Sequence, residues 1–182
     1  LEDIDGDGAR NLLLTSYWAD PNGSTSGAVY LVSLDDLADL DARDGTDGRI
    51  DMVEVGAAQA GGGRLGYVFE GTSAGDKAGV AVTTVSDLDG DGRDEIVISA
   101  PFADRDGTLP GETAGTGIVY LVNSSSLDAL DAMDGADGRI DLGNVTATGG
   151  DGQPLGYRFV GPEENPEIEM PGVTFAAAGD ID

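Results

Sequence analysis

The 182-residue sequence contains no cysteine and no histidine. Without cysteine the chain can form no disulfide and has no thiol nucleophile. Without histidine it lacks the commonest general base and the commonest ligand of transition metals, so a catalytic triad built on its serines and threonines has no usual relay. These absences predict a protein that is not an enzyme.

Positive charge and long apolar runs are also scarce. Only 9 Lys and Arg residues stand against 35 Asp and Glu residues, which gives a formal net charge of -26. This excess disfavours nucleic acids and anionic membranes as partners. No stretch approaches the roughly 20 apolar residues of a membrane-spanning helix, and the first residues are acidic, unlike those of a signal peptide. We therefore expect no membrane insertion.

The sequence has instead an acidic loop that occurs twice in full, as EDIDGDGARN and SDLDGDGRDE, and begins a third time as GDID. Two carboxylates about 4 Å apart repel by roughly 4 kcal/mol at an effective dielectric near 20, so this spacing favours a bound cation. Ca²⁺ takes six to eight oxygen ligands from loops with acidic positions one, three and five, glycine at six and a carbonyl at seven. The candidate ligands are Asp3, Asp5, Asp7, the Ala9 carbonyl and Asn11; Asp87, Asp89, Asp91, the Arg93 carbonyl and Glu95; and Asp180 and Asp182.

These loops differ from an EF-hand at position twelve and in the segment after the loop. Position twelve is Leu14 or Ile98 rather than a bidentate glutamate, and the runs NLLLTSYW and EIVISAPF are typical of strands. The ninth position is neutral Asn11 in the first loop and Glu95 in the second, which predicts a weaker first site. The alternative is a metal-free Asp-Gly turn.

The loop belongs to a longer internal repeat. GAVYLV recurs as GIVYLV, LGYVFEG as LGYRFVG, and AGVAVTTVSD as PGVTFAAAGD, in the same order along the chain. Recurrence in a fixed order is the signature of a repeat architecture. We predict one incomplete unit over residues 1–86, a second over 87–179 and the start of a third at 180–182, in a segment of a longer protein.

The second unit predicts an all-β fold of propeller type. Four short strands are expected at about residues 79–85, 95–100, 118–123 and 157–160, with the acidic loop between the first two, and four antiparallel strands form a propeller blade. Insertions at residues 33–64 and 125–154 each contain a short helical segment, SLDDLADLDA or SSLDALDAM. Two blades cannot close a ring of about four to eight, so closure needs more chain or other copies.

The run AGVAVTTVSDLDGDGRDEIVISAPFAD, followed by GTGIVYLV, resembles the FG-GAP repeat of the integrin alpha-chain propeller and its bacterial relatives. The resemblance implies a calcium-binding propeller that acts in adhesion or binds another protein, outside the cell or at its surface. Ala78-Gly79 and Pro171-Gly172 stand in place of Phe-Gly, and Ser99-Ala100-Pro101 stands in place of Gly-Ala-Pro. The alternatives are a structural array that assembles with its own copies and an accessory domain of a secreted hydrolase.

Two further features leave alternatives open. The stretches DARDGTDGRID and DAMDGADGRID are either a second calcium site or a helix end with an Asp-Gly turn, followed by a short strand at residues 49–52 in the first copy. In a calcium loop aligned on Gly48 or Gly138, the first position needs a carboxylate but holds Arg43 or Met133. This favours the turn. Trp18 and Phe102 follow equivalent strands, and we expect them to wedge between blades rather than contact a partner.

Overall fold

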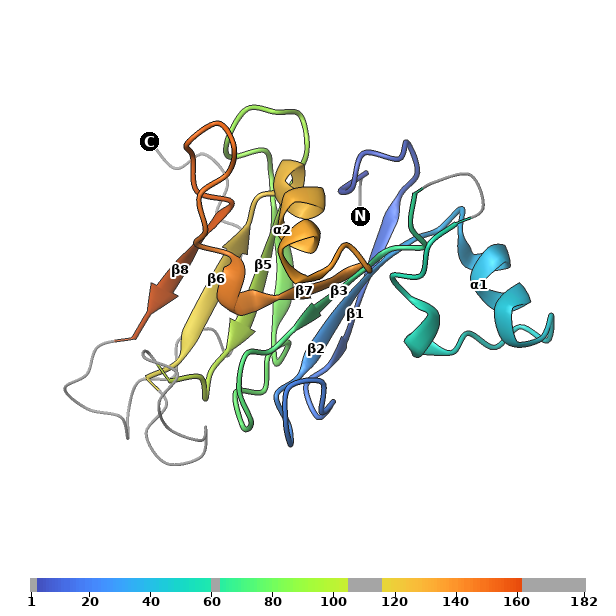
Figure 1. The fold of residues 1–182 in the computed structure, drawn as a ribbon, viewed down its shortest axis with the longest axis horizontal. Helices are drawn as coiled ribbons and strands as arrows, with labels where there is room; N and C mark the ends of the chain where they lie inside the picture. Colours follow the sequence, from blue (N-terminus) through green and yellow to red (C-terminus); the bar gives the residue numbers. More distant parts are fainter. Residues whose placement is uncertain (1–2, 60–62, 105–115, 162–182) are drawn as a thin grey trace.

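A computed structural model describes residues 3–59, 63–104 and 116–161, which form two four-stranded sheets (Figure 1). Sheet 1 has the order β1-β2-β3-β7, and sheet 2 has the order β4-β5-β6-β8. The strands are β1 (Asn11–Ser16), β2 (Ala28–Ser33), β3 (Tyr67–Glu70), β4 (Val82–Val85), β5 (Glu95–Ala100), β6 (Ile118–Val122), β7 (Arg139–Asp141) and β8 (Gly156–Val160). The helices are α1 (Leu37–Asp44) and α2 (Leu127–Asp134), with three single 3-10 turns, η1 (Met52–Glu54), η2 (Ser124–Ser126) and η3 (Leu142–Asn144). The prediction of an all-β fold is confirmed.

Sheet 2 matches the expected four-stranded unit. Each pair of neighbouring strands in this sheet is antiparallel. The predicted strands fall within a few residues of β4, β5, β6 and β8. Its strands are rich in β-branched residues, and the residues of β6 alternate between buried and half-buried, as side chains on the two faces of a strand do. The second acidic loop joins β4 to β5, where the sequence placed it.

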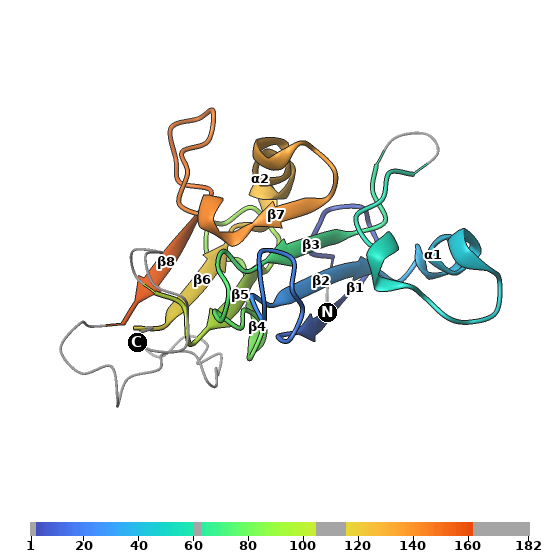
Figure 2. The ribbon, with the colours of Figure 1, turned by 60° about the horizontal axis from the view of Figure 1, so that its bottom comes forward.

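Sheet 1 departs from the prediction. Only β1, β2 and β3 come from the first repeat; the fourth strand, β7, comes from the insertion of the second repeat and lies parallel to β3, with Phe69 paired to Ile140 (Figure 2). The expected strand at residues 49–52 is wrong, because residues 49–51 form no regular element and η1 begins at Met52. A strand needs a partner, and within the described residues β3 offers one to β7 while residues 49–51 have none.

The two sheets pack face to face. On sheet 1 the apolar residues of one face include Val29, Leu31 and Phe69, and they share a single buried cluster with Ile98 and Tyr120 of sheet 2. Burying one such side chain stabilises the fold by about 1.5–3 kcal/mol, so this shared cluster holds the two repeats together. Tyr120 belongs to this cluster and is buried, and its counterpart Tyr30 is half-buried.

The insertions differ in position. The insertion with α2 lies over the β3 edge of sheet 1, whereas α1 projects from the side of the molecule (Figure 1). Gly56 and Gly138, both at positive φ, bring the two insertions into contact, because a Cβ on Gly138 would overlap the Gly56 backbone. Buried Asp131 on α2 accepts the Gly138 N–H at 2.6 Å and pairs with Arg64 of the first repeat at 2.6 Å. The second insertion is therefore fixed to both repeats.

Among the helices of the described segments, neither α1 nor α2 has the length and apolar character that crossing a bilayer requires.

The segment between β3 and β4 contains a buried carboxylate that gives a pH-dependent prediction. Burial raises the pKa of Asp76 to about 6, although its carboxylate accepts the Ser73 N–H at 2.9 Å. Because the folded state favours the protonated form, the stabilisation by Asp76 is complete below the ordinary pKa near 3.8 and is lost as pH rises to about 6.

Asp76→Asn removes this titration while keeping an acceptor for Ser73. We expect the stability of Asp76→Asn minus that of the parent to rise between about pH 4 and pH 6, by about 1.4 kcal/mol for each unit of pKa difference. Urea unfolding of both proteins in the same chelator-containing buffers measures this difference. The contribution of the other carboxylates is common to both proteins, so the subtraction removes it. A flat difference would show that Asp76 has an ordinary pKa in the folded chain.

Candidate metal loops

The two acidic loops are closed by the same hydrogen bond. In the first loop the Asn11 side-chain oxygen accepts the Ile4 N–H at 2.6 Å, and in the second the Glu95 carboxylate accepts the Leu88 N–H at 2.5 Å. Asn11 and Glu95 are the first residues of β1 and β5. In each loop, the side chain of the ninth residue, which begins the strand, therefore binds the backbone N–H of the second residue. The two loops follow the same path for this reason.

The predicted carboxylates come together within each loop. Asp3, Asp5 and Asp7 offer carboxylate oxygens within 4.8 Å of one another, and so do Asp87, Asp89 and Asp91. Residues 3–59, 63–104 and 116–161 contain no third cluster of this kind. The predicted ligands Asp180 and Asp182 lie outside the described residues.

Backbone amides bind some of these carboxylate oxygens and shape the turns. Asp3 accepts the N–H groups of Gly6 and Gly8 at 2.7 and 3.0 Å. Asp7 accepts the N–H of Ala9 at 2.7 Å, and Asp91 accepts that of Arg93 at 2.8 Å. The predicted carbonyl ligands Ala9 and Arg93 thus sit two residues beyond the third carboxylate of each loop, at the point where the loop turns into its strand.

A hard cation fits both loops, because each holds a buried carboxylate oxygen without a hydrogen-bond partner: Asp5 Oδ1 in the first and Glu95 Oε1 in the second. An unsatisfied buried polar atom costs about 1–3 kcal/mol, more when it is charged. Burial raises the pKa of Glu95, and nearby Asp89 adds to the effect; burial also raises the pKa of Asp5, with Asp7 adding to it. A cation among all-oxygen donors would relieve the unpaired charge.

The loops differ at the ninth position in a way that bears on affinity. Glu95 keeps one buried carboxylate oxygen unpaired, whereas the corresponding free atom of Asn11 is the amide nitrogen Nδ2, which is buried without a partner. An amide N–H₂ donates hydrogen bonds and cannot ligate a cation. The first loop thus has one anionic oxygen fewer than the second.

This difference predicts that the order of affinities can be reversed. Asn11→Glu is expected to tighten calcium binding at the first loop about tenfold, and Glu95→Gln to weaken it at the second by about as much, since ligand charge sets the affinity of such loops. Calorimetric titration of Asn11→Glu in an Asp89→Asn background isolates the first loop. An unchanged first-loop affinity would mean that position nine does not reach the ion.

The two loops also touch each other. The Arg93 guanidinium of the second loop donates to the Asp5 carbonyl of the first at 3.4 Å, and a Cβ on Gly6 would lie 2.5 Å from its central carbon. The sequence indicated only the Arg93 carbonyl as a ligand; it held no signal that the side chain would reach the neighbouring repeat. This cation offsets part of the negative charge of the first loop.

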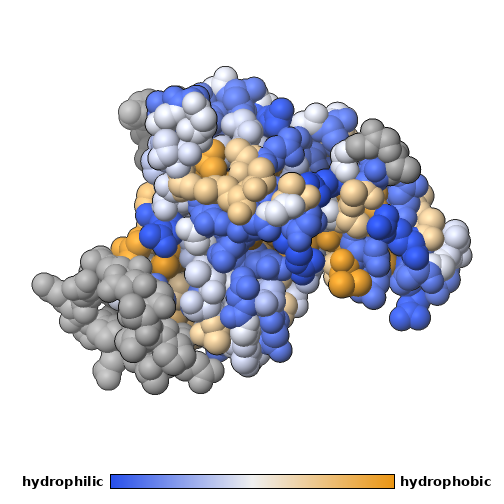
Figure 3. All heavy atoms as spheres, in the orientation of Figure 1, coloured by the Kyte–Doolittle hydropathy of each residue, from blue (hydrophilic) through white to orange (hydrophobic). Residues whose placement is uncertain are grey.

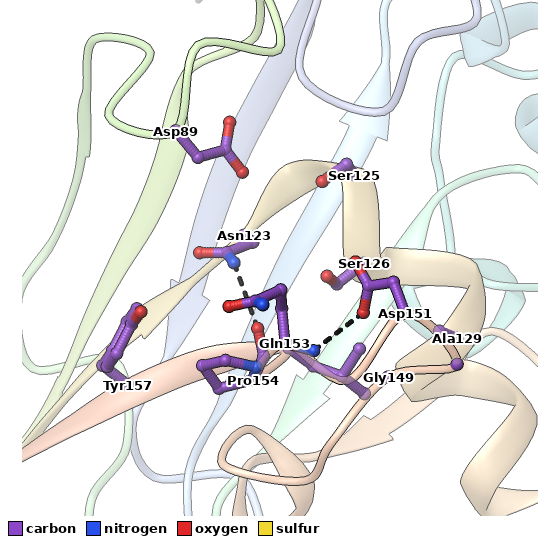
Figure 4. A pocket seen from close by; sticks show the side chains of 12 residues that line it. Asp89, Asn123, Ser125, Ser126, Ala129, Gly149, Asp151, Gln153, Pro154 and Tyr157 are labelled. Carbon is purple, nitrogen blue, oxygen red and sulfur yellow. Dashed lines mark hydrogen bonds between the residues drawn. The ribbon is translucent and has the colours of Figure 1, made fainter.

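A hollow of about 440 Å³ adjoins the second loop (Figure 4). Asp89 projects from the loop toward the hollow, and Asn123, Gln153 and Tyr157 line its other sides. Hydrogen bonds from Asn123 Nδ2 to the Pro154 carbonyl at 3.4 Å and from the Gln153 N–H to Asp151 at 2.9 Å fix part of its wall. Its lining is mixed polar and apolar, and a carboxylate of the second acidic loop and the exposed ring of Tyr157 both line it.

The second acidic element takes the form of a turn closed by hydrogen bonds. Asp41 accepts the Gly48 N–H at 2.8 Å, and its counterpart Asp131 accepts the Gly138 N–H at 2.6 Å. One oxygen of Asp131 is further paired with Arg64. Within the described part of the chain, these stretches hold no cluster of three converging carboxylates like those of the two acidic loops, which favours the metal-free turn.

Trp18 and Phe102 lie on either side of one cation. The Lys77 ammonium is 5.0 Å from the centre of the Trp18 ring and 4.3 Å from that of Phe102. The two aromatics follow equivalent strands, and the contact of Lys77 with Phe102 joins the two repeats. Trp18 does not wedge between the two sheets, because its side chain is 59% exposed. The lysine itself carried no signal in the sequence. Trp18 remains exposed on its other side.

Comparison with known proteins adds one finding. The family model of the FG-GAP repeat matches residues 78–122, which contain β4, the second acidic loop, β5 and β6. A search of curated proteins found no match. The match falls on the segment whose sequence resembles that repeat, and its boundaries enclose three of the four strands of sheet 2. The resemblance to the FG-GAP repeat is therefore confirmed over residues 78–122.

Proposed function

We propose that this chain is a calcium-stabilised segment of a β-propeller that binds other proteins outside the cell or at its surface, without catalytic activity of its own. The FG-GAP match supports the protein-interaction role, since repeats of this kind build interaction domains and are typical of extracellular or surface proteins. The excess of negative charge and the unpaired buried oxygens of the loops support the calcium. Extracellular modules commonly bind Ca²⁺ with dissociation constants of about 10⁻⁴–10⁻³ M.

Calcium would act on the connection between paired strands. When bound, the ion supplies positive charge among Asp87, Asp89 and Asp91 and so removes their mutual repulsion. Glu95 ties the loop to β5, while Arg93 contacts the first loop. The ordered loops would then present a fixed surface at one end of the sheets, which lowers the entropy lost when a partner binds.

The observation that carries this proposal is the unpaired buried oxygen that both loops keep beside converging carboxylates. Calorimetric titration with CaCl₂ should therefore show two sites in the parent and one in Asp89→Asn, with Asp151→Asn as a matched control that removes an equal charge near the same hollow. Heat from non-specific screening alone would be equal in both variants and would contradict a calcium centre at the second loop.

The interaction role needs a separate measurement. Immobilised chain, probed with a panel of secreted and surface proteins, should retain partners in calcium and release them in chelator. Asp89→Asn should reduce that retention, and Asp151→Asn should not. Retention indifferent to calcium and to Asp89 would contradict an interaction surface organised by the loops.

One observation favours the structural array as a second candidate. Sheet 2 leaves Tyr157 and Phe159 exposed on β8, whereas the equivalent residues of sheet 1 are buried. Large exposed aromatics on a sheet face are typical of an interface.

A further inference from the structure

One residue, Arg93, forms hydrogen bonds to both acidic loops. Its N–H donates to Asp91 within the second loop at 2.8 Å, and its guanidinium donates to the Asp5 carbonyl of the first loop at 3.4 Å. The two loops lie at the same end of the molecule (Figure 1). The equivalent residue of the first loop is Ala9, whose side chain carries no charge. The connection therefore runs in one direction, from the second loop to the first.

The first loop has room for the Arg93 guanidinium because Gly6 has no side chain. A Cβ on Gly6 would lie 2.5 Å from Cζ and Nη2 of Arg93 and 2.8 Å from Nη1, closer than real Cβ atoms come. Such similar distances to three atoms of a planar group indicate that its face lies against Gly6. The Gly6 N–H is in turn bound to Asp3 at 2.7 Å. The guanidinium of half-buried Arg93 is thus seated on the turn that Asp3 shapes.

A cation in this position has opposite effects on the two states of the first loop. Without calcium, its positive charge attracts Asp3, Asp5 and Asp7, whose carboxylate oxygens converge within 4.8 Å, and reduces their mutual repulsion. With calcium bound, the same charge repels the divalent ion. Arg93 therefore stabilises the empty first loop relative to the filled one.

The second loop controls how firmly Arg93 is held. The Arg93 carbonyl is the predicted seventh-position ligand of that loop, and Asp91, which binds the Arg93 N–H, belongs to its carboxylate cluster. Once this carbonyl is ligated, the Arg93 backbone is fixed. Less conformational entropy is then lost when the guanidinium binds the first loop.

We propose that Arg93 is a counter-ion of the first loop and couples the two calcium loops in opposition, so that filling of the second loop weakens calcium binding at the first. The second loop then fills first, and the first loop fills only at higher calcium. Because coupling between two binding sites is reciprocal, calcium at the first loop weakens binding at the second by the same factor. This coupling rests on the proposed calcium function and adds an order of filling to it.

The surface around the loops makes the coupling sensitive to salt. Figure 3 shows a mainly hydrophilic surface over the end of the molecule that carries both loops, and Arg93 is only half-buried. Charges in contact with water are screened over about 8 Å at physiological ionic strength. The coupling should therefore weaken as salt is raised.

Arg93→Gln removes the charge and keeps an amide donor, so its effect on stability should depend on calcium. In chelator we expect its melting temperature to lie below that of the parent by about 2–4 °C, because the first loop loses its counter-ion. In saturating calcium the difference should shrink, since tighter binding at the first loop offsets the loss. Thermal unfolding by circular dichroism measures both differences.

Arg49→Gln is the matched control for this substitution. It removes the same charge at an exposed site in the first insertion, and its melting temperature should stay close to that of the parent in both conditions. A loss that is equal in chelator and in calcium for Arg93→Gln would mean that Arg93 only packs against the first loop. That result would overturn the proposal.

Calorimetric titration with CaCl₂ measures the coupling itself. The first-loop affinity is obtained with the second loop filled, in the parent, and with it empty, in Asp89→Asn. We expect about tenfold tighter binding when the second loop is empty. With Arg93→Gln in both proteins this ratio should fall to about threefold or less, the part left by direct repulsion between the two ions. Because Asp89→Asn occurs in both comparisons, its own charge effect cancels.

The outcomes separate this coupling from the calcium assignment. A ratio that is the same with Arg93 and with Arg93→Gln, in a parent that binds two ions, overturns the coupling and leaves the calcium sites in place. A parent that lacks either binding step refutes the calcium assignment, and the coupling with it. A ratio that falls with Arg93→Gln and also falls at high salt supports the counter-ion role.

Discussion

Removing calcium is expected to lower the stability of this chain by about 2.7 kcal/mol for each site that the ion saturates at 100 times its dissociation constant. The chain has few means of compensating, since it has no disulfide and its acidic loops leave buried oxygens unpaired. For a protein of this size, about 1 kcal/mol moves the melting temperature by roughly 2–4 °C. Thermal unfolding by circular dichroism, with calcium and with excess chelator, measures the shift.

The second loop should account for the larger part of this shift. Asp89→Ala removes a carboxylate from the loop that also has Glu95, whereas Asp5→Ala acts on the loop with neutral Asn11 and a neighbouring Arg93. We expect Asp89→Ala to lower the melting temperature in calcium more than Asp5→Ala. Magnesium at equal concentration controls for simple screening. A melting temperature that ignores both chelator and Asp89→Ala would refute the calcium assignment.

Phe69→Ala is expected to destabilise the chain by about 3–5 kcal/mol, the usual cost of removing a buried phenylalanine. Phe69 is fully buried where the two sheets meet, and its loss leaves a cavity in the cluster that joins the repeats. Urea unfolding at low protein concentration, in calcium, measures the effect.

The internal repeat supplies a matched control for this substitution. Phe159→Ala makes the same change at the equivalent, exposed position of sheet 2, and should cost less than about 1 kcal/mol in the monomer. Equal losses in the two variants would mean that sheet 2 is covered in the free chain. A small loss in both would mean that the two sheets do not pack as a single core.

Much of this architecture could be predicted from the sequence because its signals are local. Alternating β-branched runs predicted the strands of sheet 2, and the acidic spacing placed two clusters of carboxylates that do converge. The order of the repeats predicted the equivalence of Asn11 and Glu95, whose side chains make the same hydrogen bond in both loops. These features depend on neighbours within about ten residues in the sequence. Each local pattern also occurs in both repeats, which makes it easier to recognise.

The features that could not be predicted depend on contacts between distant residues. The sequence Arg-Ile-Asp occurs in both insertions, yet only Arg139–Asp141 becomes a strand, because only that copy meets a free edge. The position of Lys77 between Trp18 and Phe102, and of Arg93 beside Asp5, likewise depends on how one repeat lies on the other. Identical local sequence cannot distinguish two such environments.

The parallel strand β7 has a consequence for how this chain is made. Sheet 1 contains residues near the start of the chain, but its last strand is not synthesised until Asp141. β4 lies before the second acidic loop and yet belongs to sheet 2. Each sheet therefore uses strands from both sides of the boundary between the two sequence repeats. A nascent chain released from the ribosome after one repeat would hold an unfinished sheet, so the segment that repeats in the sequence is not the segment that folds.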